Sequence, residues 1–131
     1  MRIFTPAMIG LLFATNAAPG LCALSPVDRA FGNTILSTYP DGRTAELWLQ
    51  PDGSYRAQGR RGDPSDGHWR VNGAKLCLKQ AHPFPAPFRY CTAIPSSGIN
   101  RPWSAKAVTG ERIRVRLVEG RADRREGQHR P

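Results

Sequence analysis

Histidine, the side chain most often used for acid–base catalysis and metal binding near neutral pH, occurs three times in this chain, as His68, His82 and His129. To hold a metal ion, His68 and His82 would need a third ligand, for which Asp66 is the candidate. No second Cys/His pair lies at the spacing of a zinc site. We therefore expect neither a metal nor a cofactor.

The carboxylates and hydroxyls give no sign of a catalytic centre. The ten acidic residues are scattered, and Asp41, Asp52, Asp63 and Asp66 lie in turn sequences, where an Asp side chain bonds its own backbone. The Ser96-Ser97 pair has no histidine near it in sequence to activate a nucleophile. The glycines match no phosphate-binding loop. The sequence therefore favours a protein that is not an enzyme.

Residues 1–23 have the layout of a secretory signal peptide, with a basic start, an apolar run too short to cross a membrane and small residues after it. We expect cleavage after Ala23, with cleavage after Ala17 as the alternative. A lipid anchor on Cys22 is disfavoured because Leu21, rather than a small residue, precedes it. The sequence thus predicts a periplasmic or secreted protein with no transmembrane segment in its mature chain.

Cys77 and Cys91 are the two cysteines that remain after such cleavage. Because exported proteins meet an oxidising compartment, we predict that the two form a disulfide, which for a loop of this length is worth about 3 kcal/mol. The strand alternation described below places both on outward faces, so the bond is expected to join adjacent strands from outside the core.

The chain is strongly basic, with 19 Lys and Arg against 10 Asp and Glu and a formal net charge of +9. Such a charge admits nucleic acid, anionic lipid or polysaccharide, and acidic protein surfaces as partners, and export argues against nucleic acid. Arginines at alternate positions of one predicted strand share an outward face roughly 6.6 Å apart. The predicted anion-binding surface comprises Arg112, Arg114 and Arg116, together with Arg89, Arg70 and Lys75. The alternative is a solvated face without a partner.

The strongest structural signal is the stretch 67–78, in which Asn72-Gly73 separates two alternating runs. Both residues tolerate the positive φ of a type I′ turn, so the stretch predicts a β-hairpin. This register sets Trp69 opposite Leu76 on the apolar face, with Cys77 on the other face. Trp69 is then expected at the centre of the core.

The remaining chain shows the period-two alternation of short strands, with Pro-Asp-Gly turns at 40–42 and 51–53. The predicted strands cover 34–39, 43–50, 54–58, the two arms of the hairpin, 88–94, 103–108 and 112–118. Between them lie a loop at 59–66 and a proline-stiffened crossing at 80–87. A short helix in 25–32 is expected to cover one end of the sheet, and 120–131 to be a disordered basic tail.

These elements predict a single all-β domain at residues 24–119, with about eight strands and a short N-terminal helix. No amphipathic helix separates any two strands, which indicates an up-and-down antiparallel barrel or a compact sandwich. We favour the barrel because closure removes the exposed edges that so short a chain could not otherwise protect.

The pattern Gly-x-Trp-x-Val at 67–71, followed by a tight turn and Lys-Leu-Cys-Leu at 75–78, resembles uncharacterised small exported bacterial β-barrel proteins of lipocalin-like shape. The resemblance covers residues 31–117. It implies a lipocalin-like barrel and carries no functional residues.

Two functional families of similar size offer alternatives. Periplasmic protease inhibitors are small eight-stranded barrels with one disulfide and a protruding N-terminal segment. C-type lysozyme inhibitors carry a Ser-Gly-x-x-Tyr loop, whose nearest match here begins at Asn72 and ends at Leu76. Because neither defining residue is present, we interpret that stretch as a plain hairpin turn.

Two non-enzymatic functions follow. Composition slightly favours an interaction module for envelope polyanions or a protein partner. The alternative is a carrier or sensor of a small apolar ligand, and an interior cavity above about 300 Å³ would favour it. Against the carrier, the large apolar side chains are few enough simply to fill a narrow barrel; they include Trp48, Trp69, Trp103, Leu47, Leu76 and Ile113.

Overall fold

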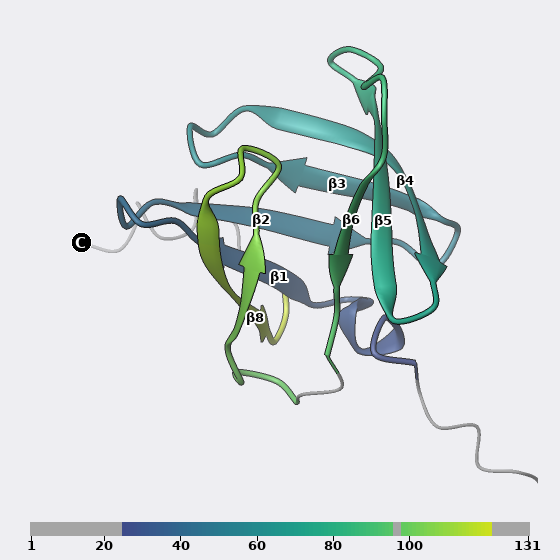
Figure 1. Cartoon of the computed structure of the whole chain (residues 1–131). Helices are drawn as coiled ribbons and strands as arrows, with labels where there is room; N and C mark the ends of the chain where they lie inside the picture. The colour runs from purple at the N-terminus through teal and green to yellow at the C-terminus, as the bar shows by residue number, and fades with distance from the viewer. Residues whose placement is uncertain (1–24, 96–97, 122–131) are drawn as a thin grey trace, which may run out of the picture.

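The computed structural model describes residues 25–95 and 98–121. Eight antiparallel strands form one nearly closed, barrel-shaped sheet, which confirms the predicted all-β class (Figure 1). The strands are β1 (Thr34–Thr38), β2 (Thr44–Leu49), β3 (Ser54–Gln58), β4 (Pro64–Asn72), β5 (Lys75–His82), β6 (Tyr90–Ala93), β7 (Trp103–Lys106) and β8 (Arg112–Val118). A 3-10 helix, η1 (Asp28–Ala30), precedes them.

The strand order is β6-β5-β4-β3-β2-β1-β8-β7, so β1 pairs with β8 and the two edges of the sheet are β6 and β7. We call the place where these two edges face each other the seam. The seam falls between strands joined by the long connection 94–102, which carries a proline near each end. The other pairs of consecutive strands, from β1 to β6 and from β7 to β8, form hydrogen-bonded antiparallel ladders.

Both Pro-Asp-Gly turns form as predicted. Gly42 and Gly53 have φ of 82° and 91°, a conformation that glycine adopts without steric cost. Asp41 accepts the backbone N–H of Arg43 at 3.0 Å. Asp52 accepts that of Ser54 at 2.9 Å in the second turn. Local turn chemistry therefore positions β1, β2 and β3.

The β4–β5 hairpin forms with a register different from the predicted one. Trp69 lies opposite Leu78, and Leu76 lies opposite Val71, so the loop residues are Gly73 and Ala74. Gly73 alone has a positive φ, of 61°. A type II′ turn needs positive φ only at its first central position, whereas the predicted type I′ turn would also have required it of Asn72. Because each partner shifts by two residues, the apolar and polar faces are unchanged.

The loop predicted at 59–66 and the crossing predicted at 80–87 are both longer than the connections in the structure, because β4 and β5 extend into them. β4 begins at Pro64 and β5 continues to His82. Proline is tolerated as the first residue of a strand, since the missing N–H is then no loss to the ladder. Between Asp66 and Gly67 the register shifts, as in a β-bulge.

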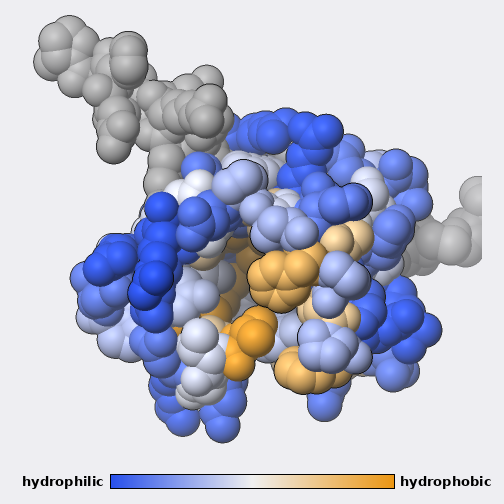
Figure 2. All heavy atoms as spheres, turned by 90° about the horizontal axis from the view of Figure 1, so that it is seen from above, coloured by the Kyte–Doolittle hydropathy of each residue, from blue (hydrophilic) through white to orange (hydrophobic). Residues whose placement is uncertain are grey.

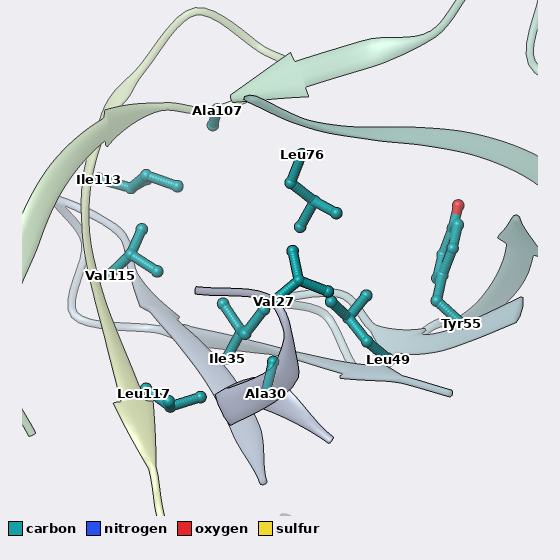
Figure 3. Packing of buried hydrophobic residues seen from close by; sticks show 10 residues of the cluster. All are labelled: Val27, Ala30, Ile35, Leu49, Tyr55, Leu76, Ala107, Ile113, Val115 and Leu117. Atoms are coloured by element: carbon teal, nitrogen blue, oxygen red, sulfur yellow. The ribbon is translucent and has the colours of Figure 1, made fainter. Parts of the chain in front are cut away.

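The hydrophobic core lies inside the barrel and includes residues from the N-terminal segment (Figure 3). Val27, at the N-cap of η1, and Ala30, within it, are 2% and 1% exposed and pack onto the inward side chains of the strands. The other buried members are Ile35, Leu49, Tyr55, Leu76, Ala107, Ile113, Val115 and Leu117. The helix thus covers one end of the sheet, as predicted.

Two tryptophans differ from their predicted places. Trp69 is half-buried at the margin of the cluster, where its ring centroid lies 5.6 Å from that of Phe31. Trp48 lies on the outer face of the sheet, because it alternates with the inward Leu47 and Leu49. Its indole N–H donates to Thr34 Oγ1 at 3.0 Å. Trp69 is therefore not the centre of the core, and Trp48 does not fill the barrel.

The last described residues pack on that outer face. Gly120 donates its N–H to Asn33 Oδ1 at 2.9 Å, and the guanidinium of Arg121 lies 4.7 Å from the centroid of the Trp48 ring. Residues 1–24 and 122–131 lie outside the described residues, so the signal peptide and the disordered tail stay predictions.

Candidate ligand-binding cavity

The interior of the barrel holds a cavity of about 350 Å³. Its wall contains large apolar side chains, but several inward positions hold small ones. The small wall residues include Ser37, Ala45, Ala57, Ser65 and Ala105. Side chains of this size leave space that Leu or Phe would fill, so the cavity follows from residue choice at alternate positions on several strands.

The two ends of the cavity differ. At one end η1 covers the core with Val27 and Ala30. The other end, which we call the mouth, is bordered by the turns after β1, β3 and β7 and by the connection between β5 and β6. Phe88 and Val108 line the cavity there, yet they are 69% and 71% exposed. Figure 2 shows apolar side chains gathered around a hollow on the upper face of the molecule. Apolar groups exposed beside an apolar cavity favour the approach of an apolar ligand.

Arg60 links three of the turns at the mouth. Its Nη2 lies 2.9 Å from Glu111 Oε1, and its Nη1 lies 3.6 Å from Asp41 Oδ2. Its guanidinium also stacks 4.4 Å from the centroid of the Tyr39 ring. The hydrogen bond to Glu111 raises the pKa of Arg60 further above its usual value. Sequence reasoning gave Arg60 no role, because its main partner is 51 residues away.

The seam is bridged by a side chain. Tyr90 on β6 donates its hydroxyl to the backbone carbonyl of Lys106 on β7. Burial raises the pKa of Tyr90, although a hydrogen bond with Thr92 opposes this shift. Trp103 also lines the cavity, and its buried indole N–H finds no acceptor among residues 25–95 and 98–121.

The predicted anion-binding residues divide into separate groups. Arg112, Arg114 and Arg116, which we call the arginine stripe, are exposed on the outer face of β8. Lys106 extends the stripe from β7, where it lies opposite Arg112. A hollow of about 260 Å³ borders the stripe, lined by Thr38, Asn100, Pro102, Arg114, Val115 and Arg116.

Arg70, Lys75 and Arg89 are also exposed but lie elsewhere. Arg70 is on β4 and Lys75 on β5, separated from β8 by β1, β2 and β3 in the sheet. Arg89 directly precedes β6, the edge strand beside β5. The sheet therefore keeps the arginine stripe together and separates Arg70 and Lys75 from it, whereas Arg89 adjoins β6, the edge that faces β7 across the seam.

Cys77 and Cys91 are joined as the sequence predicts. They lie opposite each other on β5 and β6, with Sγ atoms 2.08 Å apart and Cα atoms 4.0 Å apart. Since Leu76 and Leu78 pack inward on either side of Cys77, the bond lies on the outer face of the sheet.

His82 and Asp66, considered above as metal ligands, form an exposed pair with Nδ1 2.8 Å from Oδ1. In the described part of the chain, no three His, Cys, Asp or Glu side chains are grouped to hold a metal ion.

Comparison with protein-family models, with curated proteins and with solved structures finds no match for this chain. Within the described ranges no helix is long and apolar enough to cross a membrane. Within the described residues, the cavity and the arginine stripe offer two surfaces on which a ligand or partner could bind.

Proposed function

We propose that this protein binds a small, largely apolar ligand inside its barrel, as a carrier or a sensor. The observation that carries the proposal is the interior cavity of about 350 Å³, which lies in the range of about 300–1,000 Å³ typical of ligand sites. The cavity opens at a mouth with exposed apolar residues and is covered by η1 at the other end.

The cellular setting belongs to the same proposal. The Cys77–Cys91 bond supports an oxidising compartment, the periplasm or the cell exterior, because disulfides persist there and are rare in the cytosol. A carrier in such a compartment meets ligands that have crossed, or are about to cross, the envelope.

The ligand is expected to gain affinity by burying apolar surface. Each buried CH₂ group contributes about 0.8 kcal/mol, so in a homologous series of 1-alkanols the dissociation constant should fall about fourfold per added carbon. The fall should stop once the cavity is full. If the dissociation constant kept falling with every added carbon, the alkanols would be binding to an open surface and not inside the cavity.

A cavity-filling variant tests the site directly. Ala57 is half-buried on the cavity wall of β3, so Ala57→Leu adds volume inside the barrel. Ala74 is exposed in the β4–β5 turn, so Ala74→Leu is the matched control. Displacement of an environment-sensitive fluorescent probe should show at least tenfold weaker binding for Ala57→Leu and parental binding for Ala74→Leu. Equal affinities for the two variants would rule out the cavity as the site.

The arginine stripe supports a second candidate function, the binding of an envelope polyanion or an acidic protein. Three exposed arginines beside a hollow offer several weak contacts, each screened over about 8 Å at physiological salt. Elution from a heparin column should need less salt after replacement of Arg112, Arg114 and Arg116 by Gln. The matched control, with the same change in charge, replaces the exposed Arg56, Arg70 and Lys75, which lie on β3, β4 and β5, by Gln. Equal elution of the two triple variants would show that net charge alone, and not the stripe, governs binding.

A further inference from the structure

The cavity wall contains a buried tyrosine whose hydroxyl has no partner among the described residues. Tyr55 is 5% exposed and lines the cavity, and its hydroxyl makes no hydrogen bond to any residue in 25–95 or 98–121. Figure 3 shows this hydroxyl pointing away from the aliphatic side chains of the core. Of the other two tyrosines on the cavity wall, Tyr90 gives its hydroxyl to the carbonyl of Lys106, and Tyr39 lies at the mouth with its ring against Arg60. The hydroxyl oxygen itself remains accessible, so it is open to a ligand group that enters the cavity.

The surroundings of Tyr55 leave space for a ligand group. Its cross-strand neighbour is Gly67, which has no side chain to reach the hydroxyl. Ser65 lies diagonally across on β4 and also lines the cavity, without a side-chain hydrogen bond to the described residues. Gln80, opposite Gly67 on β5, gives its side-chain N–H to the carbonyl of Phe84. Two hydroxyls without a partner among the described residues therefore lie on the β3–β4 side of the cavity wall.

The cavity is suited to a neutral group. Glu46 borders it, but it alternates with the inward Ala45 and Leu47, so its carboxylate lies on the outer face. No other acidic or basic side chain of the described residues lines the cavity. Burial, assisted by the charge of Asp66, raises the pKa of Tyr55 above its usual value of 10.0, so the phenol stays protonated near neutral pH. A charged ligand group would lose its hydration without gaining a counter-ion.

We propose that Tyr55 is the hydrogen-bond anchor of the cavity, assisted by Ser65, and that the ligand is a neutral, mostly apolar molecule with one hydroxyl or carbonyl group. This inference rests on the proposed binding function and adds the chemical class of its ligand. A cavity of roughly 150 Å³ holds benzene, so about 350 Å³ has room for a ring with a short substituent.

A pair of nearly isosteric probes tests the anchor. 4-Ethylphenol and 4-ethyltoluene differ only by a hydroxyl in place of a methyl group. We expect Tyr55→Phe to weaken the binding of 4-ethylphenol by about 3- to 10-fold, the range of a single neutral hydrogen bond, while 4-ethyltoluene changes by less than about twofold. Ser65→Ala should also weaken 4-ethylphenol more than 4-ethyltoluene, with a smaller effect. This second variant tests the proposal even if Tyr55→Phe fails to fold. Tyr90→Phe is the matched control, since its hydroxyl is already engaged, and it should affect both probes equally.

The outcomes separate the two proposals. If 4-ethyltoluene binds the parent and Tyr55→Phe weakens both probes equally or neither, the anchor is overturned and the binding function stands. If neither probe binds the parent, both proposals are overturned. Binding of 4-ethylbenzoate as tight as that of 4-ethylphenol at pH 7 would overturn the neutral ligand class.

Discussion

Tyr90 reaches across the seam of the barrel and donates its hydroxyl to the backbone carbonyl of Lys106. The two residues belong to β6 and β7, the edge strands, between which no ladder forms in the described part of the chain. At this point a side-chain hydrogen bond connects two neighbouring strands, whereas backbone hydrogen bonds connect the other strands. The same tyrosine lines the cavity, so one side chain contributes both to the closure of the seam and to the cavity wall.

Replacing Tyr90 by Phe should loosen the seam without unfolding the barrel. The variant loses one hydrogen bond at a partly accessible site, so we expect the free energy of unfolding to fall by about 1 kcal/mol. Amide hydrogen exchange should accelerate in β6 and β7 and stay at the parental rate in β3, at the centre of the sheet. Uniform acceleration in all strands would contradict a local role. Tyr39→Phe, at the mouth, provides the control and should leave the exchange of β6 and β7 unchanged.

The disulfide should contribute strongly to stability because of the strand it holds. β6 pairs with β5 on one side and has no ladder partner on the other. Cys77 and Cys91 are 14 residues apart, a loop for which the chain-entropy model gives about 3 kcal/mol. Urea unfolding of the oxidised parent and of a Cys77→Ser/Cys91→Ser variant should differ by about this amount. A reducing agent should lower the stability of the parent and leave the variant unaffected. Mass measurement after alkylation would refute the bond if protein from its native compartment carried two free thiols.

Trp69 and Trp103 offer a comparison of a satisfied and an unsatisfied indole. The Trp69 N–H donates to the carbonyl of Gln50 at 2.8 Å, whereas the buried N–H of Trp103 has no acceptor among the described residues. Each Trp→Phe substitution removes apolar surface, but only Trp69→Phe also breaks a hydrogen bond. We expect Trp69→Phe to cost about 1–2 kcal/mol more than Trp103→Phe in chemical unfolding. Equal costs would show that the Trp69 hydrogen bond contributes nothing net.

The parts of this fold that could be predicted depend on short-range chemistry. The Pro-Asp-Gly turns, the alternation of β8 and the outward face of Cys77 each follow from neighbouring residues. The register of the β4–β5 hairpin was missed because Asn72-Gly73 and Gly73-Ala74 both suit a two-residue loop, and the choice depends on the pairing of whole strands.

The features of the candidate site were not predictable in the same way. Arg60 and Glu111 meet only because the barrel brings two distant turns to the same end. The cavity arises from small residues on separate strands, such as Ala45, Ala57 and Ala105, and its volume depends on how tightly the sheet curves. The tryptophans in the sequence favour a filled barrel, whereas the effect of the small inward residues becomes apparent only when all the strands are in place.

Gly67 is a position where no other residue should fit. A Cβ placed on it would lie 2.0 Å from the carbonyl oxygen of Lys79, a backbone atom that is unable to rotate aside. Gly67→Ala should therefore displace β5 at the bulge and lower the free energy of unfolding by more than about 2 kcal/mol. Gly98→Ala is the control, because no atom of the described residues lies within 4 Å of its Cβ position, and it should change stability by less than about 0.5 kcal/mol. If the Gly67→Ala protein were as stable as the control, the backbone of β5 would have to lie farther from Gly67 than 2.0 Å from its Cβ position.

The raised pKa of Tyr55 predicts how stability depends on alkaline pH. In the unfolded chain the phenol ionises near pH 10, whereas in the folded barrel burial, with a further contribution from the charge of Asp66, holds the proton to higher pH. Above pH 10 the unfolded state thus binds fewer protons than the folded state, so the stabilisation present below pH 10 is lost as pH rises through the folded pKa. Urea unfolding at pH 8, 9, 10 and 11 should show the parent losing stability relative to Tyr55→Phe only in the alkaline part of the series. When both proteins also carry Asp66→Asn, the difference in stability between them at alkaline pH should be smaller, because the charge that helps to raise the pKa of Tyr55 is gone. If the stability of the parent and that of Tyr55→Phe changed in parallel with pH, the phenol would be as well hydrated in the barrel as in the unfolded chain. Such a hydroxyl would gain little from a hydrogen bond to a ligand, which would contradict its role as the anchor.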